Sequence, residues 1–392
     1  MSDDDIRLYD DEAEHRRAVL YSRIREWLTL VGMVWSLATT LLLLSTGLSA
    51  RIRNVARDIT PARLDPVIPY IAMFSLVTYL TSLPLSWVSG FFVEHRFGLS
   101  NQSLRDWLIE SLKGLGLSVV ITSLLGEGAY WVIKRYPRRW WAILSGLTVP
   151  VSVLFGALAP VLIMPLFNKY EPLRNRDLAE RLERLAAEQG VQVSDVMQMD
   201  MSKQTRKANA MFTGIGRTKR IVLGDTMLDE FAPDEVEVVI AHELGHQVHR
   251  DIWKLVALSA PLSAISLLTA FRVLPEAIHR FGKQWGLNES EGAADVAALP
   301  LLTLIAGLPI TLLTPALNAL IRSQVEHPAD VYAIELTHSP SAFIAAMIKL
   351  GRMNLSNPKP SAIVKWMLYD HPTIAERIAY ARSREGTTGQ QT

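Results

Sequence analysis

The chain has 392 residues, of which 49% are apolar, and its formal net charge at pH 7 is +1. A charge this close to zero gives no broad basic surface, so we expect no nucleic-acid partner. Cysteine is absent, which excludes disulfides, thiolate metal sites and cysteine nucleophiles and leaves histidine and carboxylate as the strong metal ligands. The mean hydropathy of +0.18 is high for a soluble protein and favours membrane helices.

In chain order, a polar segment comes first, over residues 1–26, without the apolar core and cleavage site of a signal peptide. Six apolar stretches follow, each long enough to cross a bilayer, which takes about 20 helical residues. They are Trp27–Leu48, Ile68–Val93, Leu108–Ile133, Trp140–Phe167, Trp253–Leu274 and Val296–Ile321. The alternative, buried helices of a large soluble core, is disfavoured because six such runs recur between basic loops.

The longest polar stretch lies between the fourth and fifth apolar stretches. Within it, Arg176–Gln189 repeats apolar residues at helical spacing and predicts a surface helix. Ala208–Phe212 and Arg220–Leu223 flank a glycine-containing turn and predict a β-hairpin. Pro233, followed by two acidic residues, is typical of a helix N-terminus. The region is therefore predicted to be mixed α and β.

The helix predicted from Pro233 onward carries an H-E-x-x-H motif, in which His242 and His246 are four residues apart. This spacing puts both imidazoles on one helix face, where they can share a tetrahedral Zn²⁺. Glu243 stays next to the metal and can take a proton from a water molecule. The alternative is a helix with incidental surface histidines.

A catalytic zinc site needs a third protein ligand and one open position. Glu326, after the sixth stretch, is our candidate ligand, and Asp330 lies four residues later on the same helix face. Asp330 can accept a hydrogen bond from the outer nitrogen of a ligand histidine. The alternative is a solvated acidic face at a helix start. Two membrane crossings separate His246 from Glu326, which returns the chain to the same side.

His249 and His327 are two further candidates for the third ligand. Three ligands along one straight helix, with His249 as the third, would span about 10 Å, too far for one zinc ion. His327, next to Glu326, is the runner-up for the third ligand. We therefore predict a site of His242, His246 and Glu326, with Glu243 as the catalytic base.

The sequence also resembles the type I CAAX prenyl proteases, which are intramembrane zinc metalloproteases of the gluzincin type. Four separated segments carry this resemblance in the family's order: Phe92–Leu104, Met164–Leu173, Asn209–Gly214 with Lys219–Thr226, and Asp370–Arg377. The resemblance implies a helix bundle around a large water-filled chamber. The sequence departs from the family pattern at three points. It has six spans where seven are typical, Met211 where the family has a bulky aromatic residue, and Gln324 where the family has arginine.

The resemblance also implies roles for individual residues. Glu326 would be the third ligand and Asp330 the acid behind a ligand histidine. His371 would stabilise the oxyanion of the tetrahedral intermediate. Asn209 and Ala210 would lie on a strand edge that pairs with the substrate backbone. Arg377 would belong to the polar network around the site and contribute to substrate binding.

We therefore predict a mainly α membrane protein, a polytopic bundle of about six transmembrane helices enclosing a chamber, with an α+β zincin-type metalloprotease domain. The predicted segments are a polar N-terminal segment (1–26), four transmembrane helices (27–167), a catalytic region with the edge hairpin (168–252), two transmembrane helices (253–321), a second catalytic region with the third ligand (322–384) and a disordered tail (385–392).

The predicted function is hydrolysis of peptide bonds by zinc-activated water, on a peptide or protein substrate that includes, by resemblance, prenylated C-terminal peptides. The alternatives are a membrane quality-control protease of the HtpX type and a non-catalytic receptor or transporter with a vestigial metal site. We expect an integral protein of a bacterial inner membrane with its active site facing the cytoplasm, because Arg250, Lys254 and Arg322 flank the active side.

Overall fold

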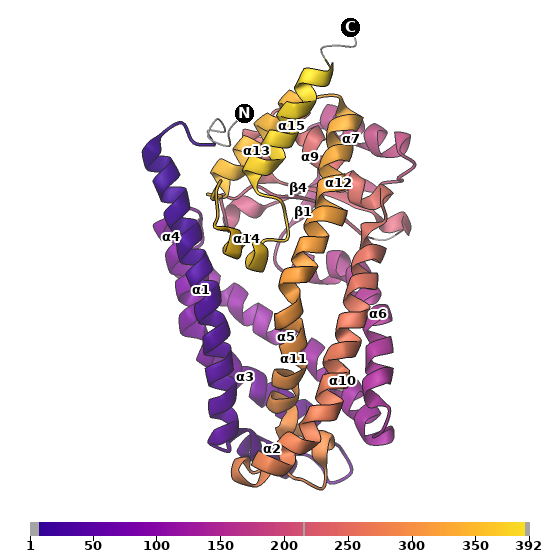
Figure 1. Cartoon of the computed structure of the whole chain (residues 1–392). Coiled ribbons are helices and arrows are strands. Elements are labelled where there is room, and N and C mark those ends of the chain that lie inside the picture. The colour runs from indigo at the N-terminus through magenta and orange to yellow at the C-terminus, as the bar shows by residue number, and fades with distance from the viewer. Residues whose placement is uncertain (1–7, 215, 389–392) are drawn as a thin grey trace.

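The structure is a computed structural model and describes residues 8–214 and 216–388. Long helices form a tall bundle, and a smaller unit with the sheet lies at one end, together with the described end of the C-terminal helix (Figure 1). The long helices are α1 (Glu12–Ser45), α3 (Val67–Trp87), α5 (Leu104–Arg135), α6 (Trp140–Leu158), α10 (Asp251–Trp285) and α11 (Leu299–Ile321).

Six helical segments in the described part of the chain are long and apolar enough to cross a membrane, which confirms the six predicted stretches. Their apolar side chains face outward: Trp27 is 63% exposed, Leu124 67% and Leu312 75%. Contiguous apolar surface of this kind is stable only against lipid or a partner. Helix α10 has 35 residues and is therefore about 50 Å long, which exceeds the roughly 30 Å hydrocarbon core.

The first transmembrane helix is longer than the sequence predicted. Helix α1 begins at Glu12, inside the polar segment 1–26, because Asp11 caps its N-terminus by accepting a hydrogen bond from the Ala13 backbone N–H. At the other end of the chain, α15 (Ile374–Thr388) continues into the predicted tail, so residues 385–388 are helical rather than disordered. Residues 1–7 and 389–392 lie outside the described ranges.

The smaller unit contains a four-stranded sheet with strand order β1-β2-β4-β3. Strands β2 and β4 are parallel, and the other two pairs are antiparallel. The hairpin of β3 with β4 and the helix α7 confirm two of the sequence predictions. The bounds are Tyr170–Pro172 for β1, Asp195–Met199 for β2, Ala210–Thr213 for β3, Arg220–Gly224 for β4 and Arg176–Glu188 for α7.

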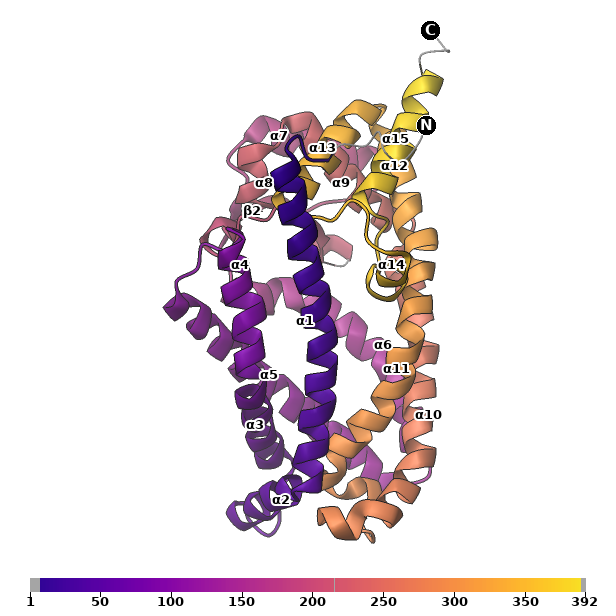
Figure 2. The same cartoon turned by 60° about the vertical axis from the view of Figure 1, so that its left-hand side comes forward.

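Most of the remaining helices surround this sheet or link it to the bundle, while α2 (Leu48–Ile59) lies at the opposite end of the bundle (Figure 1). The others are α4 (Val93–Arg96), α8 (Asp225–Glu230), α9 (Pro233–Val248), α12 (His327–Thr337), α13 (Pro340–Met353) and α14 (Ala362–Leu368). Helix α9 packs against β3, α12 and α13, and its Ile240 and Leu244 are fully buried. Helix α14 lies beside α11, just below α15 (Figure 2).

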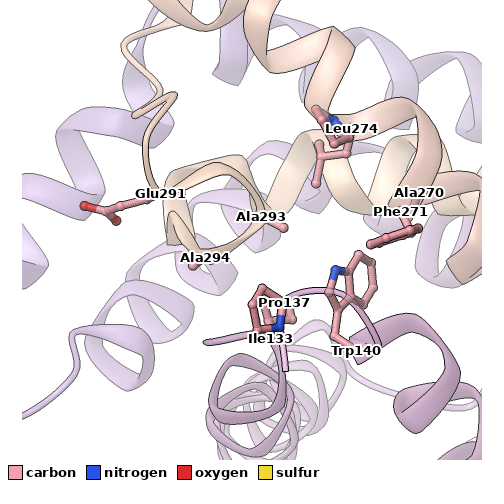
Figure 3. A pocket seen from close by; sticks show the side chains of 10 residues that line it. Ile133, Pro137, Trp140, Ala270, Phe271, Leu274, Glu291, Ala293 and Ala294 are labelled. Carbon is pink, nitrogen blue, oxygen red and sulfur yellow. The ribbon is translucent and has the colours of Figure 1, made fainter. Parts of the chain in front are cut away.

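The end of the bundle away from the sheet is closed by a network of polar contacts. There α2 meets the loop between α10 and α11, and Arg53 forms a buried ion pair of 2.6 Å with Asp295. Ser49 donates a hydrogen bond of 2.7 Å to the Ala297 carbonyl. Beside this loop, Trp140 and Phe271 line an apolar pocket (Figure 3), which is remote from the histidines of α9.

Between α1, α3 and α5 lies a hollow of about 700 Å³ at membrane depth. Hydroxyl groups line much of it, including those of Ser36, Thr39, Ser82 and Ser118. Several of these hydroxyls donate a hydrogen bond to the backbone carbonyl one turn earlier in their own helix, as Thr39 does to Trp35. The hollow gives the bundle a polar inner wall, while a single water-filled chamber around the active site stays a prediction.

Candidate active site

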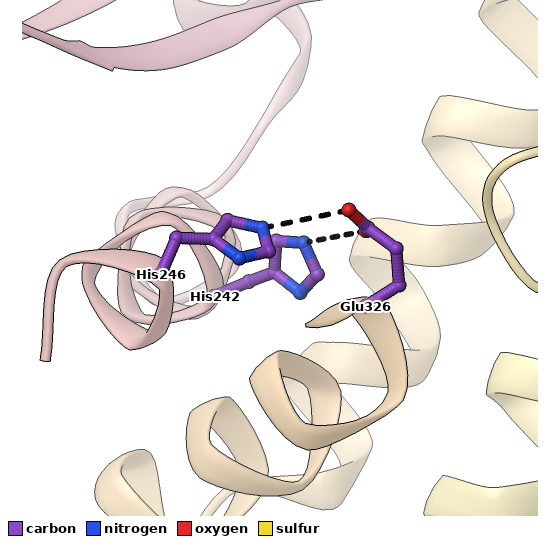
Figure 4. Close-up of side chains that lie close together, drawn as sticks. All are labelled: His242, His246 and Glu326. Carbon is purple, nitrogen blue, oxygen red and sulfur yellow. Dashed lines mark ion pairs between the residues drawn. The ribbon is translucent and has the colours of Figure 1, made fainter. Parts of the chain in front are cut away.

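Three side chains from two separate segments converge above the membrane helices. His242 and His246 project from one face of α9, and Glu326 approaches from the end of the π-helical turn Arg322–Glu326 (Figure 4). Their ligand atoms lie within 4.8 Å of one another, which makes the group a candidate metal site. The His242 Nε2–Glu326 Oε2 distance is 3.5 Å, and the His246 Nε2–Glu326 Oε1 distance is 3.8 Å. Two ligands of a tetrahedral zinc at about 2.1 Å each lie about 3.4 Å apart, which is close to both histidine–glutamate distances.

The glycine within the motif allows the two halves of the site to approach. A Cβ added at Gly245 would lie 3.2 Å from Tyr332 Cδ1 and 3.3 Å from Ala329 Cα, both in α12. Any larger residue would therefore push α9 away from the helix that follows Glu326. The two imidazoles lie one turn apart with their rings nearly perpendicular, at 86°, and their centroids separated by 4.8 Å. Close packing of α9 on α12 thus sets the distance between the histidines and the glutamate.

Each ligand histidine is held from behind by a buried carboxylate. Asp330 Oδ1 lies 2.9 Å from His242 Nδ1, as the sequence predicted. Asp251 Oδ2 lies 2.9 Å from His246 Nδ1, a contact that the sequence analysis missed. Both carboxylates are 2% exposed. Because each Nδ1 donates to a carboxylate, each Nε2 is left as the metal-binding lone pair.

The carboxylate of Glu326 carries the clearest sign that a cation belongs here. It is buried, and its Oε2 has no hydrogen-bond partner among the described residues. A buried carboxylate oxygen without a hydrogen bond is costly unless positive charge lies beside it. His371 Nε2, at 3.1 Å, and the two α9 imidazoles are the groups around it. Two imidazole nitrogens and a carboxylate are the donor set of a catalytic zinc site.

Two histidines of the site, His242 and His371, have altered pKa values. Burial lowers the pKa of His242, but its interactions with the carboxylates of Asp330 and then Glu326 outweigh burial and raise it to about 9. Burial also lowers the pKa of His371, but its hydrogen bond to Asp370 and the charges of Glu326 and Asp370 together outweigh burial, so the net direction is upward. Both shifts describe a site in which imidazolium and carboxylate attract each other. A divalent cation would replace the proton on the ligand histidine.

Arg377 lies behind His242. Its Nε donates to both carboxylate oxygens of Asp330 at 3.0 Å, and its Nη2 lies 3.3 Å from His242 Nδ1. The side chain is 10% exposed. The structure thus gives Arg377 a contact with the acid that holds a ligand, and the predicted contact with substrate stays a prediction.

The remaining predicted residues take positions that suit their predicted roles without testing them. Glu243 follows His242 in α9 and is half-buried, with no ion pair or side-chain hydrogen bond to any described residue. Ala210 begins β3, which is the outer strand of the sheet, and Asn209 precedes it with an exposed side chain. His371 is half exposed, and its Nδ1 lies 2.8 Å from Asp370 Oδ1.

The two rejected histidines lie outside the cluster. The His249 ring packs edge-on against Tyr332 at the C-terminus of α9, and the His327 ring packs edge-on against Tyr380. Neither belongs to the group of ligand atoms found in the described part of the chain.

Comparison with known proteins agrees with this geometry. Residues 172–385, more than half of the chain, match the model of peptidase family M48. The chain belongs to peptidase family M48. Residues 4–169 match the family's companion model, described as the CAAX prenyl protease N-terminal region with five membrane helices. Over the described part of this range, residues 8–169, the structure has four segments able to span a membrane and the short α2, which at 12 residues cannot cross a bilayer.

Individual relatives of this M48 protein span nearly its whole length. It is 33% identical to the uncharacterized metalloprotease YhfN of Bacillus subtilis (strain 168), over 95% of the chain and 86% of that protein. It is 30% identical to CAAX prenyl protease 1 of Saccharomyces cerevisiae, over 94% of the chain and 85% of that protein. The crystal structure of S. mikatae Ste24p shares the fold, with a TM-score of 0.83 at 24% identity over 95% and 90% of the two chains. The M48 protein is therefore a membrane metalloprotease, as its sequence predicted.

Proposed function

We propose that this M48 protein is a zinc endopeptidase in which His242, His246 and Glu326 bind the metal and Glu243 is the catalytic base. The observation that carries the proposal is the convergence of two imidazole nitrogens, from His242 and His246, on the buried carboxylate of Glu326. Zinc bound there would polarise the scissile carbonyl and make water a nucleophile near neutral pH.

The residues of the chain supply the remaining steps. Glu243 accepts a proton from the attacking water and passes it to the leaving amine. His371, which protonates readily because its pKa is raised, donates a hydrogen bond to the oxyanion as the carbonyl carbon becomes tetrahedral. Asp330 and Asp251 keep the ligand rings oriented throughout.

The outer edge of β3 provides the substrate-binding element in this proposal. Strand β3 pairs with β4 on one side, and among the described strands nothing pairs with its other side. An extended peptide can add to such an edge through backbone hydrogen bonds. Asn209 and Ala210 lie at the start of this edge, so peptide backbone running along β3 would be presented to α9, which packs against the same strand.

For the substrate we propose a peptide at the membrane surface, with a prenylated C-terminal peptide as the first choice. Relatives named CAAX prenyl protease 1 cover the chain almost completely, and the site lies at the end of a membrane bundle, where a lipidated peptide would be anchored. Quality-control cleavage of unfolded membrane proteins, as in the HtpX type, is the second candidate. We further propose a bacterial inner membrane location with a cytoplasmic site, because Arg250 and Lys254 follow the site helix directly.

The test compares cleavage of one peptide in prenylated and unprenylated form, with and without a chelator, by the full-length protein in lipid nanodiscs. Glu243→Gln removes the base but no ligand, so we expect turnover to fall at least about 100-fold while one zinc per chain remains by elemental analysis. Glu237→Gln, on the same helix but ion-paired with Arg181, is the control and should stay active. Loss of zinc from Glu243→Gln, or full turnover without it, would contradict the proposal.

A further inference from the structure

The loop that carries His371 is only five residues long, Tyr369 to Thr373, and joins α14 to α15. Within this loop, His371 reaches the metal site, where its Nε2 lies 3.1 Å from Glu326 Oε2. The position of a half-exposed histidine depends on what fixes the ends of its loop. Each end is fixed in a different way.

At the α15 end, the loop is held by the helix that follows. Glu376 Oε2 accepts a hydrogen bond of 3.0 Å from the Thr373 backbone N–H, and Thr373 Oγ1 accepts one of 3.2 Å from the Glu376 backbone N–H. This reciprocal pair is a capping box. Next in the sequence, Arg377 binds Asp330. The C-terminal end of the loop is therefore joined to the site through α15.

At the α14 end, the loop is held from another helix. Arg322 donates from Nη1 to the carbonyl oxygens of Lys365, at 3.2 Å, and of Tyr369. One turn earlier, Asn318 Nδ2 donates to the carbonyl of Met367 at 3.3 Å. The last carbonyls of a helix lack partners within it, and a cation is favoured at this end. Asn318 and Arg322 therefore cap α14 from the side.

Apart from these bonds, helix α14 is held by the ion pair of Lys365 with Glu376 of α15. None of its residues is buried, and its Ile363 and Trp366 are 71% and 52% exposed. Arg322, for its part, has no ion-pair partner among the described residues, so its guanidinium is free of any carboxylate that would draw it away from the α14 carbonyls. The hydrogen bonds from α11 and the π-helical turn are thus the main polar attachment of α14 to the bundle.

The same turn ends in the metal ligand. Arg322 and Glu326 are the first and last residues of the π-helical turn, and such single-turn π-helices occur frequently at functional sites. From this one turn, Arg322 fixes the loop of His371 and Glu326 fixes the metal. The α14 end of the His371 loop and the ligand carboxylate are therefore attached to the same short turn.

We infer that Arg322, assisted by Asn318, is a positioning residue that holds His371 against the metal site through the backbone of α14. The inference rests on the proposed function, in which His371 acts on the reacting carbonyl. Without Arg322 the metal ligands keep their own supports, Asp330 and Asp251, so zinc stays bound. The oxyanion donor is misplaced, and a shift of about 1 Å can cost about 100-fold in rate.

The test uses the zinc-loaded full-length protein in nanodiscs and compares Arg322→Gln, His371→Ala and the double variant. For Arg322→Gln we expect kcat to fall about 10- to 100-fold, KM to change less than about threefold, and zinc content to stay at the wild-type level. The double variant should be no slower than His371→Ala alone, because both changes remove the same interaction. Asn318→Ala, which removes one of the capping bonds, should lower kcat by less, and Arg322→Lys should restore part of it.

Arg174→Gln is the matched control, since Arg174 is 81% exposed and pairs only with nearby Glu171. The inference is overturned if Arg322→Gln keeps wild-type kcat while His371→Ala is slow, if the two effects multiply in the double variant, or if KM rises instead of kcat falling. Should Arg322→Gln not fold, Asn318→Ala and Arg322→Lys decide by the same criteria. If His371→Ala and Glu243→Gln both retain full turnover, the proposed function fails first, and that outcome is distinguishable from failure of the positioning role alone.

Discussion

Two buried groups of charged residues lie at opposite ends of the bundle, and they differ in one respect. At the end away from the sheet, Asp295 Oδ2 accepts from Arg53, at 2.6 Å, and from the Asn288 backbone N–H, while Oδ1 accepts from the Ala297 backbone N–H. At the other end, Glu326 Oε2 is buried without a hydrogen bond. A carboxylate whose oxygens are all satisfied holds the fold together. A carboxylate left open among imidazoles is available to a ligand.

We expect the largest effect on stability at the end of the bundle away from the sheet, where Arg53 and Asp295 form the buried ion pair. Arg53→Ala leaves Asp295 buried and unpaired, so the free energy of unfolding should fall by about 3–5 kcal/mol, while zinc content of the folded protein is unchanged. Chemical denaturation in detergent measures the first and elemental analysis the second. Arg57→Ala is the control, because its ion pair with Glu291 is 42% and 36% exposed and such pairs are worth about 1 kcal/mol or less. Equal stability of the two variants would refute the contrast.

At the open end, removing a supporting carboxylate should weaken metal binding rather than stability. Asp251→Ala takes away the acceptor for His246 Nδ1, and zinc affinity should fall about 10- to 100-fold, measured by competition with a fluorescent chelator. Asp251→Asn keeps an oxygen acceptor and should recover part of the loss. Asp229, exposed and in α8, gives the control Asp229→Ala. Unchanged affinity in Asp251→Ala would remove this residue from the site.

Protons and zinc compete for His242, so zinc affinity at the open site should depend on pH. In the metal-free protein the pKa of His242 is raised to about 9, so the imidazolium is stabilised below that pH and must lose its proton before it can bind a metal. Zinc affinity should therefore fall about tenfold for each pH unit below 9 if this one proton is displaced. Chelator competition at pH 6.5 and 7.5 measures the slope. A flat profile would show that His242 is already neutral.

The smallest expected effect concerns the approach of α9 to α12. Gly245→Ala introduces a methyl group 3.2–3.3 Å from α12, so the ligands should separate slightly and zinc affinity should drop by less than about tenfold. Gly116→Ala in α5 meets nothing within 4 Å and should have no effect on zinc. The two variants are compared in the same titration. If Gly245→Ala binds zinc like the wild type, α12 yields to the methyl group and the glycine is not required for close packing.

The sequence was most informative where spacing alone determines geometry. Six long apolar runs can be little else than membrane helices, and histidines four residues apart on a helix share a face. Glu326 was found because it follows an even number of crossings and precedes Asp330 at helical spacing. The edge hairpin was visible from its turn residues. These features are local, or follow from counting.

The sequence was less informative where a contact joins distant segments. Asp251 lies only five residues after His246, yet a backbone turn through Arg250, at φ 55°, separates the two helices, and helical spacing does not extend across it. The contact of Arg322 with the α14 carbonyls spans more than forty residues and leaves no mark in side-chain patterns, because its acceptors are backbone atoms. The early start of α1 was missed because polar residues hid a well-capped helix.

The long hairpin formed by α10 and α11 has a consequence for how the protein is made. Two of the three predicted ligands precede this hairpin in the chain, and the third follows it. A ribosome-bound chain that ends before residue 326 contains the two predicted histidine ligands but lacks the third predicted ligand. With the proposed ligands, the metal site is complete only after the last two helices have been inserted and folded back, so we expect an unfinished or misinserted chain to be inactive.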